Sequence, residues 1–198
     1  MKRLAAVERK KQIIEAAVSL FSEKGFSGTT TRELAKGAGV SEALLFRFFP
    51  DKEALYEAIL SNKMEEQIPA VLENLPAGEN PQKLLYELAL RIVNHNIKDP
   101  SFMRLLLFSA LEGHELSDLF FRKRNLPLLE FLKGNFQEEM KKKKLKRLDP
   151  ELAARAFLSM VYGFLQTRIL FRIPKVVRRP VSEILKVYVA IFFEGLSS

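Results

Sequence analysis

Residues 25–53 read GFSGTTTRELAKGAGVSEALLFRFFPDKE, and this stretch decides the fold. Thr30 and Glu33 are spaced as a capping box, in which a threonine hydroxyl and a glutamate three residues later satisfy the first free amides of a helix. We therefore predict a short helix from Thr31 to about Gly37, which is about two turns long.

A second short helix follows directly. The chain turns at residues 38–40, Ser41 is suited to cap a helix that runs to Phe48, and Pro50 ends it. Two short helices joined by a tight, glycine-containing turn form a helix-turn-helix, whose second helix enters the major groove of DNA by its N-terminal end. At that end the second helix would present Glu42, Ala43, Leu44 and Arg47 to solvent.

An apolar stripe marks a third helix in front of this stretch. Its members recur at helical spacing and are Ile13, Ile14, Ala17, Leu20 and Phe21. Gly25 follows as a residue that commonly ends helices. We predict that residues 1–50 form a three-helix DNA-binding domain.

The rest of the chain keeps helical periodicity, and strand-like alternation is nearly absent. Asp99 and Asp149 each precede a proline suited to a first helical turn, and Pro127 would break or kink a long helix. The predicted helices span 52–74, 81–98, 100–112, 116–143, 150–172 and 182–195. We therefore expect an all-α fold of about nine helices, in which residues 51–198 form a larger ligand-binding and dimerisation domain.

Composition narrows the class of protein. Hydrophobic residues make up 47% of the 198, enough for a substantial core, and cysteine is absent. The absence of cysteine excludes disulfides and thiolate metal sites and fits a reducing cytoplasm, which is the location we expect. We expect no secretory leader, and no stretch approaches the roughly 18 apolar residues of a membrane span. The formal net charge of +8 favours an anionic partner, with nucleic acid first.

From the first helix to Leu55 the sequence resembles the TetR/AcrR family of transcriptional repressors. The threonine entry, the Ala-Gly-Val-Ser turn and the Phe-Pro-x-Lys-Glu exit are in register. The resemblance implies a homodimer that binds a palindromic operator in double-stranded DNA and leaves it when a small-molecule effector binds. Phosphate or groove-edge contacts are implied for Thr30, Thr31, Arg32 and Lys52. Positions at or near the bases are implied for Ser41, Glu42, Ala43, Leu44 and Arg47, and Phe46 is also counted among the DNA-binding residues.

Three features depart from the family pattern. Phe46 stands where the family usually has a tyrosine whose hydroxyl donates to a phosphate, and Phe48 stands where histidine is common. Ala43 and Leu44 replace the usual glycine and small polar residue, so Leu44 is expected to read thymine methyl groups by apolar contact. Both phenylalanines are also compatible with packing against the core. Affinity would then depend on Arg32, Arg47, Lys52 and the N-terminal Lys2, Arg3, Arg9 and Lys10.

The resemblance also implies that the final two helices pair with those of a second subunit. Both are too apolar for one buried face, although burial within the protomer would explain the same pattern. The predicted dimer residues are Phe157, Met160, Phe164, Ile184, Tyr188 and Ile191.

An effector pocket is expected among the helices from about residue 81 to 172, where aromatic side chains are abundant. Its predicted residues are Tyr86, His95, Phe102, Met103, Phe131, Phe157, Tyr162 and Arg168. Further polar candidates, each equally compatible with a structural or solvent-facing role, are Asn94, Glu112 and His114.

Three other functions remain open at this point. An enzyme is disfavoured because the chain has no phosphate-binding glycine loop, nucleophile elbow or HExxH, and we expect no catalytic residue, metal or cofactor. A basic protein that coats DNA without sequence preference would bind every duplex with steep salt dependence. A membrane-surface protein would use the basic helices, but the lysine run at 141–147 is typical of a solvated helix end, and no membrane partner is expected.

Overall fold

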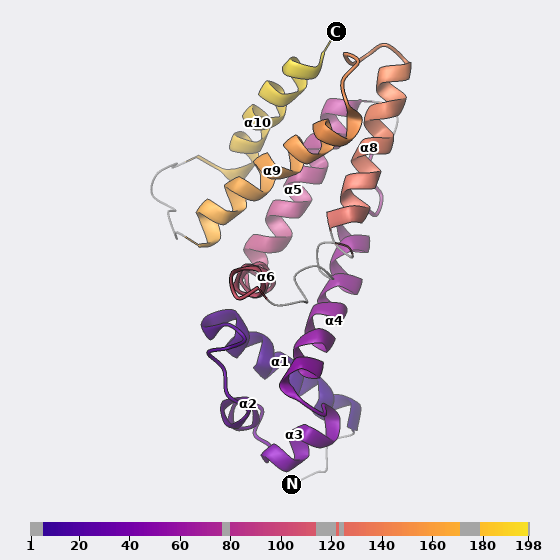
Figure 1. Ribbon diagram of the computed structural model, residues 1–198. Helices are drawn as coiled ribbons and strands as arrows, with labels where there is room; N and C mark the ends of the chain where they lie inside the picture. Colours follow the sequence, from indigo (N-terminus) through magenta and orange to yellow (C-terminus); the bar gives the residue numbers. More distant parts are fainter. Residues whose placement is uncertain (1–5, 77–79, 114–121, 123–124, 171–178, 198) are drawn as a thin grey trace. The chain divides into compact units, whose positions relative to one another are not determined.

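The computed structural model describes residues 6–76, 80–113, 122, 125–170 and 179–197. Within these ranges every regular element is helical, apart from one isolated bridge between Leu145 and Ser197, which confirms the all-α prediction. The helices (Figure 1) are α1 Ala6–Lys24, α2 Thr31–Gly37, α3 Glu42–Phe48, α4 Lys52–Leu72, α5 Pro81–Lys98, α6 Ser101–Leu111, α8 Leu126–Lys141, α9 Pro150–Ile169 and α10 Val181–Leu196. None of the described helices is long and apolar enough to cross a membrane.

Local signals predicted most helix starts. Helices α2 and α3 have the predicted bounds, and Asp149 caps α9 by accepting hydrogen bonds from the amides of Glu151 and Leu152 at 2.8 and 3.1 Å. Asp99 is the residue that ends α5, and α6 begins at Ser101 with Pro100 as its N-cap residue. Pro127 lies in the first turn of α8, where proline is tolerated because no amide partner is needed. The earlier part of the predicted 116–143 helix lies outside the described residues.

The helices group by their contacts into two units. The first contains α1–α3, α4 up to Glu66, and α6. The second contains the end of α4, from Gln67, with α5, α8, α9 and α10. Helix α6 therefore packs with the N-terminal helices, although it lies in the stretch 51–198 that we expect to form the larger domain.

A single apolar cluster holds the first unit together. It includes the helix-turn-helix positions Leu34 and Leu45, which are 1% and 2% exposed, and Phe102 of α6, which is fully buried. Tyr56 of α4 lies in the middle, with its ring centroid 5.0 Å from that of Phe21 and 5.2 Å from that of Phe26. Burial of these rings removes a large apolar area from water and fixes α4 and α6 against α1.

The hydroxyl of Tyr56 donates a hydrogen bond of 2.9 Å to the carbonyl oxygen of Leu105 in α6. Burial raises the pKa of Tyr56 to about 12, and the charge of Glu112 adds to the rise. The tyrosine is therefore a neutral donor at any physiological pH, and it joins α4 to α6.

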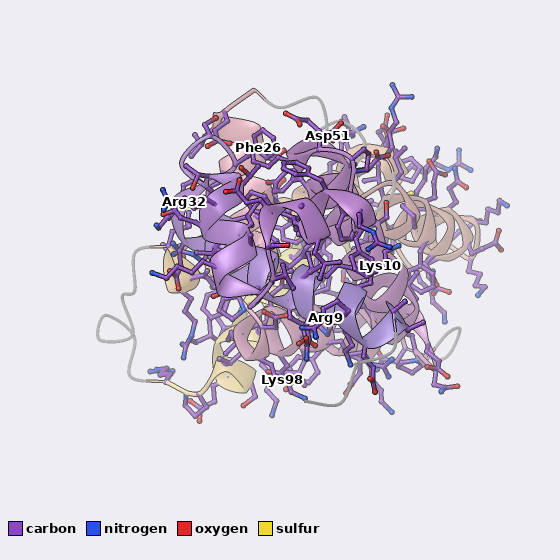
Figure 2. All side chains as sticks on the ribbon, turned by 90° about the horizontal axis from the view of Figure 1, so that it is seen from below. Arg9, Lys10, Phe26, Arg32, Asp51 and Lys98 are labelled. Atoms are coloured by element: carbon purple, nitrogen blue, oxygen red, sulfur yellow. The ribbon has the colours of Figure 1, made fainter. Side chains whose placement is uncertain are left out.

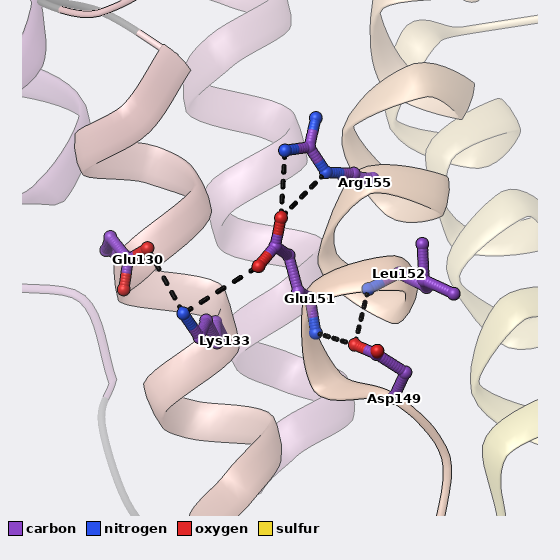
Figure 3. A network of polar contacts seen from close by, with 6 residues as sticks. All are labelled: Glu130, Lys133, Asp149, Glu151, Leu152 and Arg155. Carbon is purple, nitrogen blue, oxygen red and sulfur yellow. Dashed lines mark hydrogen bonds and ion pairs between the residues drawn. The ribbon is translucent and has the colours of Figure 1, made fainter.

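In the second unit α8 packs on α9, and α5 packs on both α9 and α10. Figure 3 shows the polar network at the start of α9, where Glu151 accepts from Arg155 at 2.8 and 3.1 Å and pairs with Lys133 of α8 at 3.8 Å. Such exposed pairs contribute at most about 1 kcal/mol each, so the apolar contacts between these helices dominate the stability of this unit.

Candidate nucleic-acid interface

The start of α2 is fixed by a complete capping box. The hydroxyl of Thr30 accepts from the amide of Glu33 at 3.2 Å, and the carboxylate of Glu33 accepts from the amide of Thr30 at 2.9 Å. Lys24 donates to the same carboxylate at 2.6 Å. The lysine bond and the threonine bonds together lower the pKa of Glu33 to about 2, so the cap stays ionised at neutral pH.

The turn between α2 and α3 places their N-terminal ends side by side. Gly39 adopts a φ of +64°, which glycine tolerates without steric cost. The hydroxyl of Ser41 caps α3 by accepting from the amide of Leu44 at 3.2 Å. Thr31 then joins the two helices, because its hydroxyl donates to the carboxylate of Glu42 at 3.0 Å.

Most of the predicted DNA-binding side chains face solvent on α2, on α3 and at their capping residues. Leu44 and Thr31 are partly exposed, while the exposed residues are Thr30, Arg32, Ser41, Glu42, Ala43, Phe46 and Arg47. The structure also separates the two phenylalanines, because Phe46 is 42% exposed whereas Phe48 packs against the core cluster. Phe46 is therefore available to a partner, and Phe48 serves the fold.

Cations surround this surface. Arg32 lies on one side of it and Lys10 on the opposite side in Figure 2, where the first unit is seen from below. The Nζ of Lys10 lies 5.5 Å from the centroid of the Phe49 ring, and Arg9 donates to Gln12 at 3.0 Å. Exposed cations around helix N-termini attract phosphate, which is how proteins set their register on a duplex. Lys2 and Arg3, which we expected to contribute, lie outside the described residues.

Lys52 has a role that the sequence did not indicate. Its ammonium donates to the carbonyl oxygens of Phe26 and Thr29 at 3.0 and 3.1 Å and lies 4.1 Å from the centroid of the Phe26 ring. Two of its three N–H donors are thus used inside the protein. The predicted phosphate contact by Lys52 must compete with these bonds.

Glu112, a polar candidate for the effector pocket, bonds to the loop between α1 and α2. In the first unit its carboxylate accepts from the amides of Phe26 and Ser27 at 3.1 and 3.2 Å. Helix α6 is also joined to α1 where Arg104 donates to the carbonyl oxygen of Ser22 at 2.6 Å. No sequence pattern marks these contacts, since the acceptors and donors on the α1 side are backbone atoms more than 80 residues away.

The predicted pocket residues are divided between the two units. Phe102 and Met103 are buried in α6 of the first unit. In the second unit Phe157 is fully buried, with its ring centroid 5.3 Å from that of Phe192, and the guanidinium of Arg168 lies 6.0 Å from the centroid of the Phe164 ring. His95, Phe131 and Tyr162 are partly exposed there, and His114 lies outside the described residues.

Two of the hollows in the second unit are lined by described residues throughout. One of about 20 Å³, the size of a single water molecule, is lined by Leu84, Phe136 and Glu139 among others. The other, of about 270 Å³, is lined by Asn80, Gln82, Lys83, Tyr86, Lys186 and Val189. Tyr86 is the one predicted pocket residue that lines either of these two hollows. Among the described residues, no group of three or more acidic or histidine side chains could hold a metal ion.

The predicted dimer residues differ in their burial. Phe157 and Ile184 are 0% and 7% exposed within the protomer, so their side chains have almost no area to offer a second subunit. Ile191 is 65% exposed, and Met160, Phe164 and Tyr188 are partly exposed. Leu152 and Val187, which are outside the predicted set of dimer residues, add exposed apolar area. An apolar surface therefore exists on α9 and α10, and it includes exposed residues that are not among the six predicted dimer residues.

Two neighbouring carboxylates pair with part of the lysine run at the end of α8. Lys141 pairs with Glu138 at 2.8 Å, and Glu139 pairs with Lys142 and Lys144 at 2.8 and 3.4 Å. This pairing agrees with a solvated helix end, where cations also favour the negative end of the helix dipole.

Comparison with known proteins identifies this arrangement. Residues 13–59 match the model of bacterial regulatory proteins of the tetR family, and residues 84–194 match that of the AefR-like transcriptional repressor C-terminal domain. The chain is 27% identical over 159 residues to the uncharacterized HTH-type transcriptional regulator YhgD of Bacillus subtilis, covering 78% of this chain and 81% of YhgD. It is 32% identical over 120 residues to the nucleoid occlusion factor SlmA of Haemophilus ducreyi, covering 59% of each chain.

The fold agrees as well. The structure of AibR in complex with isovaleryl coenzyme A and operator DNA is similar, with a TM-score of 0.73 and 23% sequence identity over 93% of this chain and 98% of AibR. Because the two family models lie on the helix-turn-helix and on most of the remaining helices, this chain belongs to the TetR family of DNA-binding bacterial transcriptional regulators.

Proposed function

We propose that this regulator is a homodimeric repressor that binds a palindromic operator and is released from it by a small-molecule effector. The observation that carries the proposal is the exposed surface formed by the capped N-terminal ends of α2 and α3. Arg32 in the first turn of α2 and Arg47 in the last turn of α3 are exposed, and the Thr31–Glu42 bond fixes the two helices to each other. Arg47 is the side chain best suited to read a base, since arginine binds guanine in the major groove with two hydrogen bonds.

Dimerisation is supported by the apolar surface on α9 and α10. Ile191 and Val187 are 65% and 49% exposed on one helix, and Leu152 is 64% exposed on the other. Covering these side chains with a second copy would remove them from water. Two recognition helices related by a twofold axis then require half-sites about 34–36 Å apart, which is why we expect a palindrome.

The existence of an effector site is supported by the AibR structure, which contains isovaleryl coenzyme A as well as operator DNA. We propose that the effector site uses second-unit residues of the predicted set, namely Tyr86, His95, Phe131, Tyr162 and Arg168. An effector weakens DNA binding only to the extent that it prefers the conformation that cannot bind DNA. Effector binding therefore shifts the population of the protein toward the conformation that cannot bind DNA.

The test is selection of duplexes from random DNA by the purified protein, followed by fluorescence anisotropy on the selected sequence and a scrambled one across a salt series. A palindrome bound at least about a thousandfold more tightly than the scrambled duplex supports the proposal. Equal, steeply salt-dependent binding to both duplexes contradicts it and indicates a protein that coats DNA.

A second candidate function comes from the likeness to SlmA, which is named a nucleoid occlusion factor. Such a protein would bind many chromosomal sites, whereas a repressor of one regulon would bind a few promoters. Mapping the bound sites on the chromosome of the source organism separates the two, because the number and position of the sites differ.

A further inference from the structure

Residues 25–29 of the loop between α1 and α2 are held from two sides by opposite charges. The carboxylate of Glu112 accepts from the amides of Phe26 and Ser27, at 3.1 and 3.2 Å. The ammonium of Lys52 donates to the carbonyl oxygens of Phe26 and Thr29, at 3.0 and 3.1 Å. We propose that Glu112, which follows α6, is a positioning residue for DNA binding because it holds this loop and thereby the N-terminal end of α2.

The loop is built to receive a carboxylate. Two successive amides that point to one anion form a concavity typical of backbone anion sites, and bonds to an ionised acceptor are about twice as strong as neutral ones. Gly25 makes room for it, since a Cβ at this position would lie 2.5 Å from Oε1 of Glu112. The lack of a side chain at residue 25 and the carboxylate at residue 112 are therefore complementary.

A continuous set of hydrogen bonds leads from Glu112 to the recognition helix. Within the loop, the hydroxyl of Thr29 donates to the carbonyl oxygen of Gly25 at 2.8 Å. Thr30 follows at once as the cap of α2, and Thr31 donates to Glu42 of α3 at 3.0 Å. Release of the amides at residues 26 and 27 would therefore loosen the start of α2 and the helix pair that it orders.

A purely electrostatic role of Glu112 and a positioning role predict changes of opposite sign in DNA affinity, so an experiment can separate them. Glu112 is an anion in the unit that binds a polyanion, so removing its charge without changing its position should strengthen DNA binding. A positioning role predicts weaker binding after the same change. The sign of the change in affinity thus separates the two.

The experiment is to compare wild type with Glu112→Gln on the duplex that the wild-type protein selects from random DNA. We expect about tenfold weaker binding, or 1.4 kcal/mol, with an unchanged dependence on salt because no phosphate contact is lost. The matched control is Glu23→Gln, which neutralises an exposed carboxylate of α1 that has no hydrogen bond or ion pair among the described residues. It should bind as tightly as wild type or slightly more so.

A spectroscopic readout accompanies the affinity. In wild type the amides of Phe26 and Ser27 should be protected from hydrogen exchange, and in Glu112→Gln their resonances should shift more than those of the α1 core. Equal or tighter DNA binding by Glu112→Gln, or unprotected amides in wild type, overturns the inference; the amide measurement decides it even if the variant folds poorly. The inference on Glu112 rests on the proposed operator binding. If the wild-type protein selects no duplex, both proposals fail. If it selects one and Glu112→Gln binds that duplex unchanged, only the inference on Glu112 fails.

Discussion

The ammonium of Lys52 lies 4.1 Å from the centroid of the Phe26 ring, over one face of an aromatic group whose other members are Phe21 and Tyr56. A cation over a ring in a partly buried place contributes about 1 kcal/mol, in addition to the two hydrogen bonds that Lys52 makes. The first residue of α4 therefore closes the core of the first unit at the loop before α2.

For this reason we expect Lys52→Ala to weaken DNA binding by destabilising the first unit. We expect the free energy of unfolding to fall by about 1–3 kcal/mol, because charged hydrogen bonds and the contact with the ring are lost. DNA affinity should fall while the slope of log K against log salt stays the same. Urea denaturation and anisotropy in a salt series measure both quantities. A slope smaller by about 1 would instead show that Lys52 binds a phosphate, as the family resemblance implies.

Arg47→Ala should weaken binding to the selected operator by about 1–3 kcal/mol and relax the preference at one base pair. Arg32→Ala is the comparison, since a phosphate contact should weaken all sequences alike and lower the salt slope by about 1. Repeated selection with each variant shows which base preference is lost. Wild-type affinity in both variants would contradict the assignment of this surface.

The Tyr56 hydroxyl should make stability depend on alkaline pH. Its pKa is raised from the ordinary value of 10.0 to about 12 in the folded protein. The folded protein therefore holds this proton more tightly than the unfolded chain, and the stabilisation is complete below pH 10 and lost as the pH rises toward 12. Tyr56→Phe has no such proton, so the difference in unfolding free energy between wild type and variant should shrink across this range in urea titrations. A constant difference would show that the hydroxyl is not buried.

Gly25 and Gly39 form a matched pair for testing the loop. Both have positive φ, +77° and +64°, so alanine at either position costs about 1–2 kcal/mol of backbone strain. At Gly39 no atom lies within 4 Å of the added Cβ, whereas at Gly25 the Cβ would displace Glu112. Thermal unfolding of Gly25→Ala should show the larger loss, by about 1–3 kcal/mol more. Equal losses would mean that Glu112 does not occupy this place.

Ile191→Asp should dissociate the proposed dimer. Ile191 is 65% exposed in the protomer, and a carboxylate buried without a partner at an interface should weaken association by about a hundredfold or more. Val7→Asp, at a valine that is 80% exposed on α1, is the control and should leave the oligomeric state unchanged. Sedimentation equilibrium across a concentration series reports both. Unchanged association of Ile191→Asp would move the interface away from α10.

The features that could be predicted from the sequence are those whose causes are local. The cap at Thr30, the cap at Ser41 and the turn at Gly39 each depend on residues within four positions, so the bounds of α2 and α3 were confirmed to the residue. Lys52 and Glu112 bind backbone atoms at 23 to 86 positions away, and no side-chain pattern marks such partners.

Aromatic content alone does not locate the effector pocket, for a different reason. Core packing and ligand binding both need large apolar side chains, and sequence alone does not separate them. Phe102 and Phe157 are fully buried in the protomer, whereas the hollow of about 270 Å³ is lined by Tyr86 together with polar residues such as Gln82 and Lys83.

The bond between Thr31 and Glu42 bears on how such a protein would search a chromosome. The bond fixes the carboxylate of Glu42 at the N-terminal end of α3. Exposed cations near it attract DNA of any sequence. Glu42 gains from a cytosine amino group but is repelled wherever it meets only acceptors. We expect its repulsion to shorten the residence time on unrelated DNA, so that the carboxylate lets the protein move on until the right base pair holds it in place.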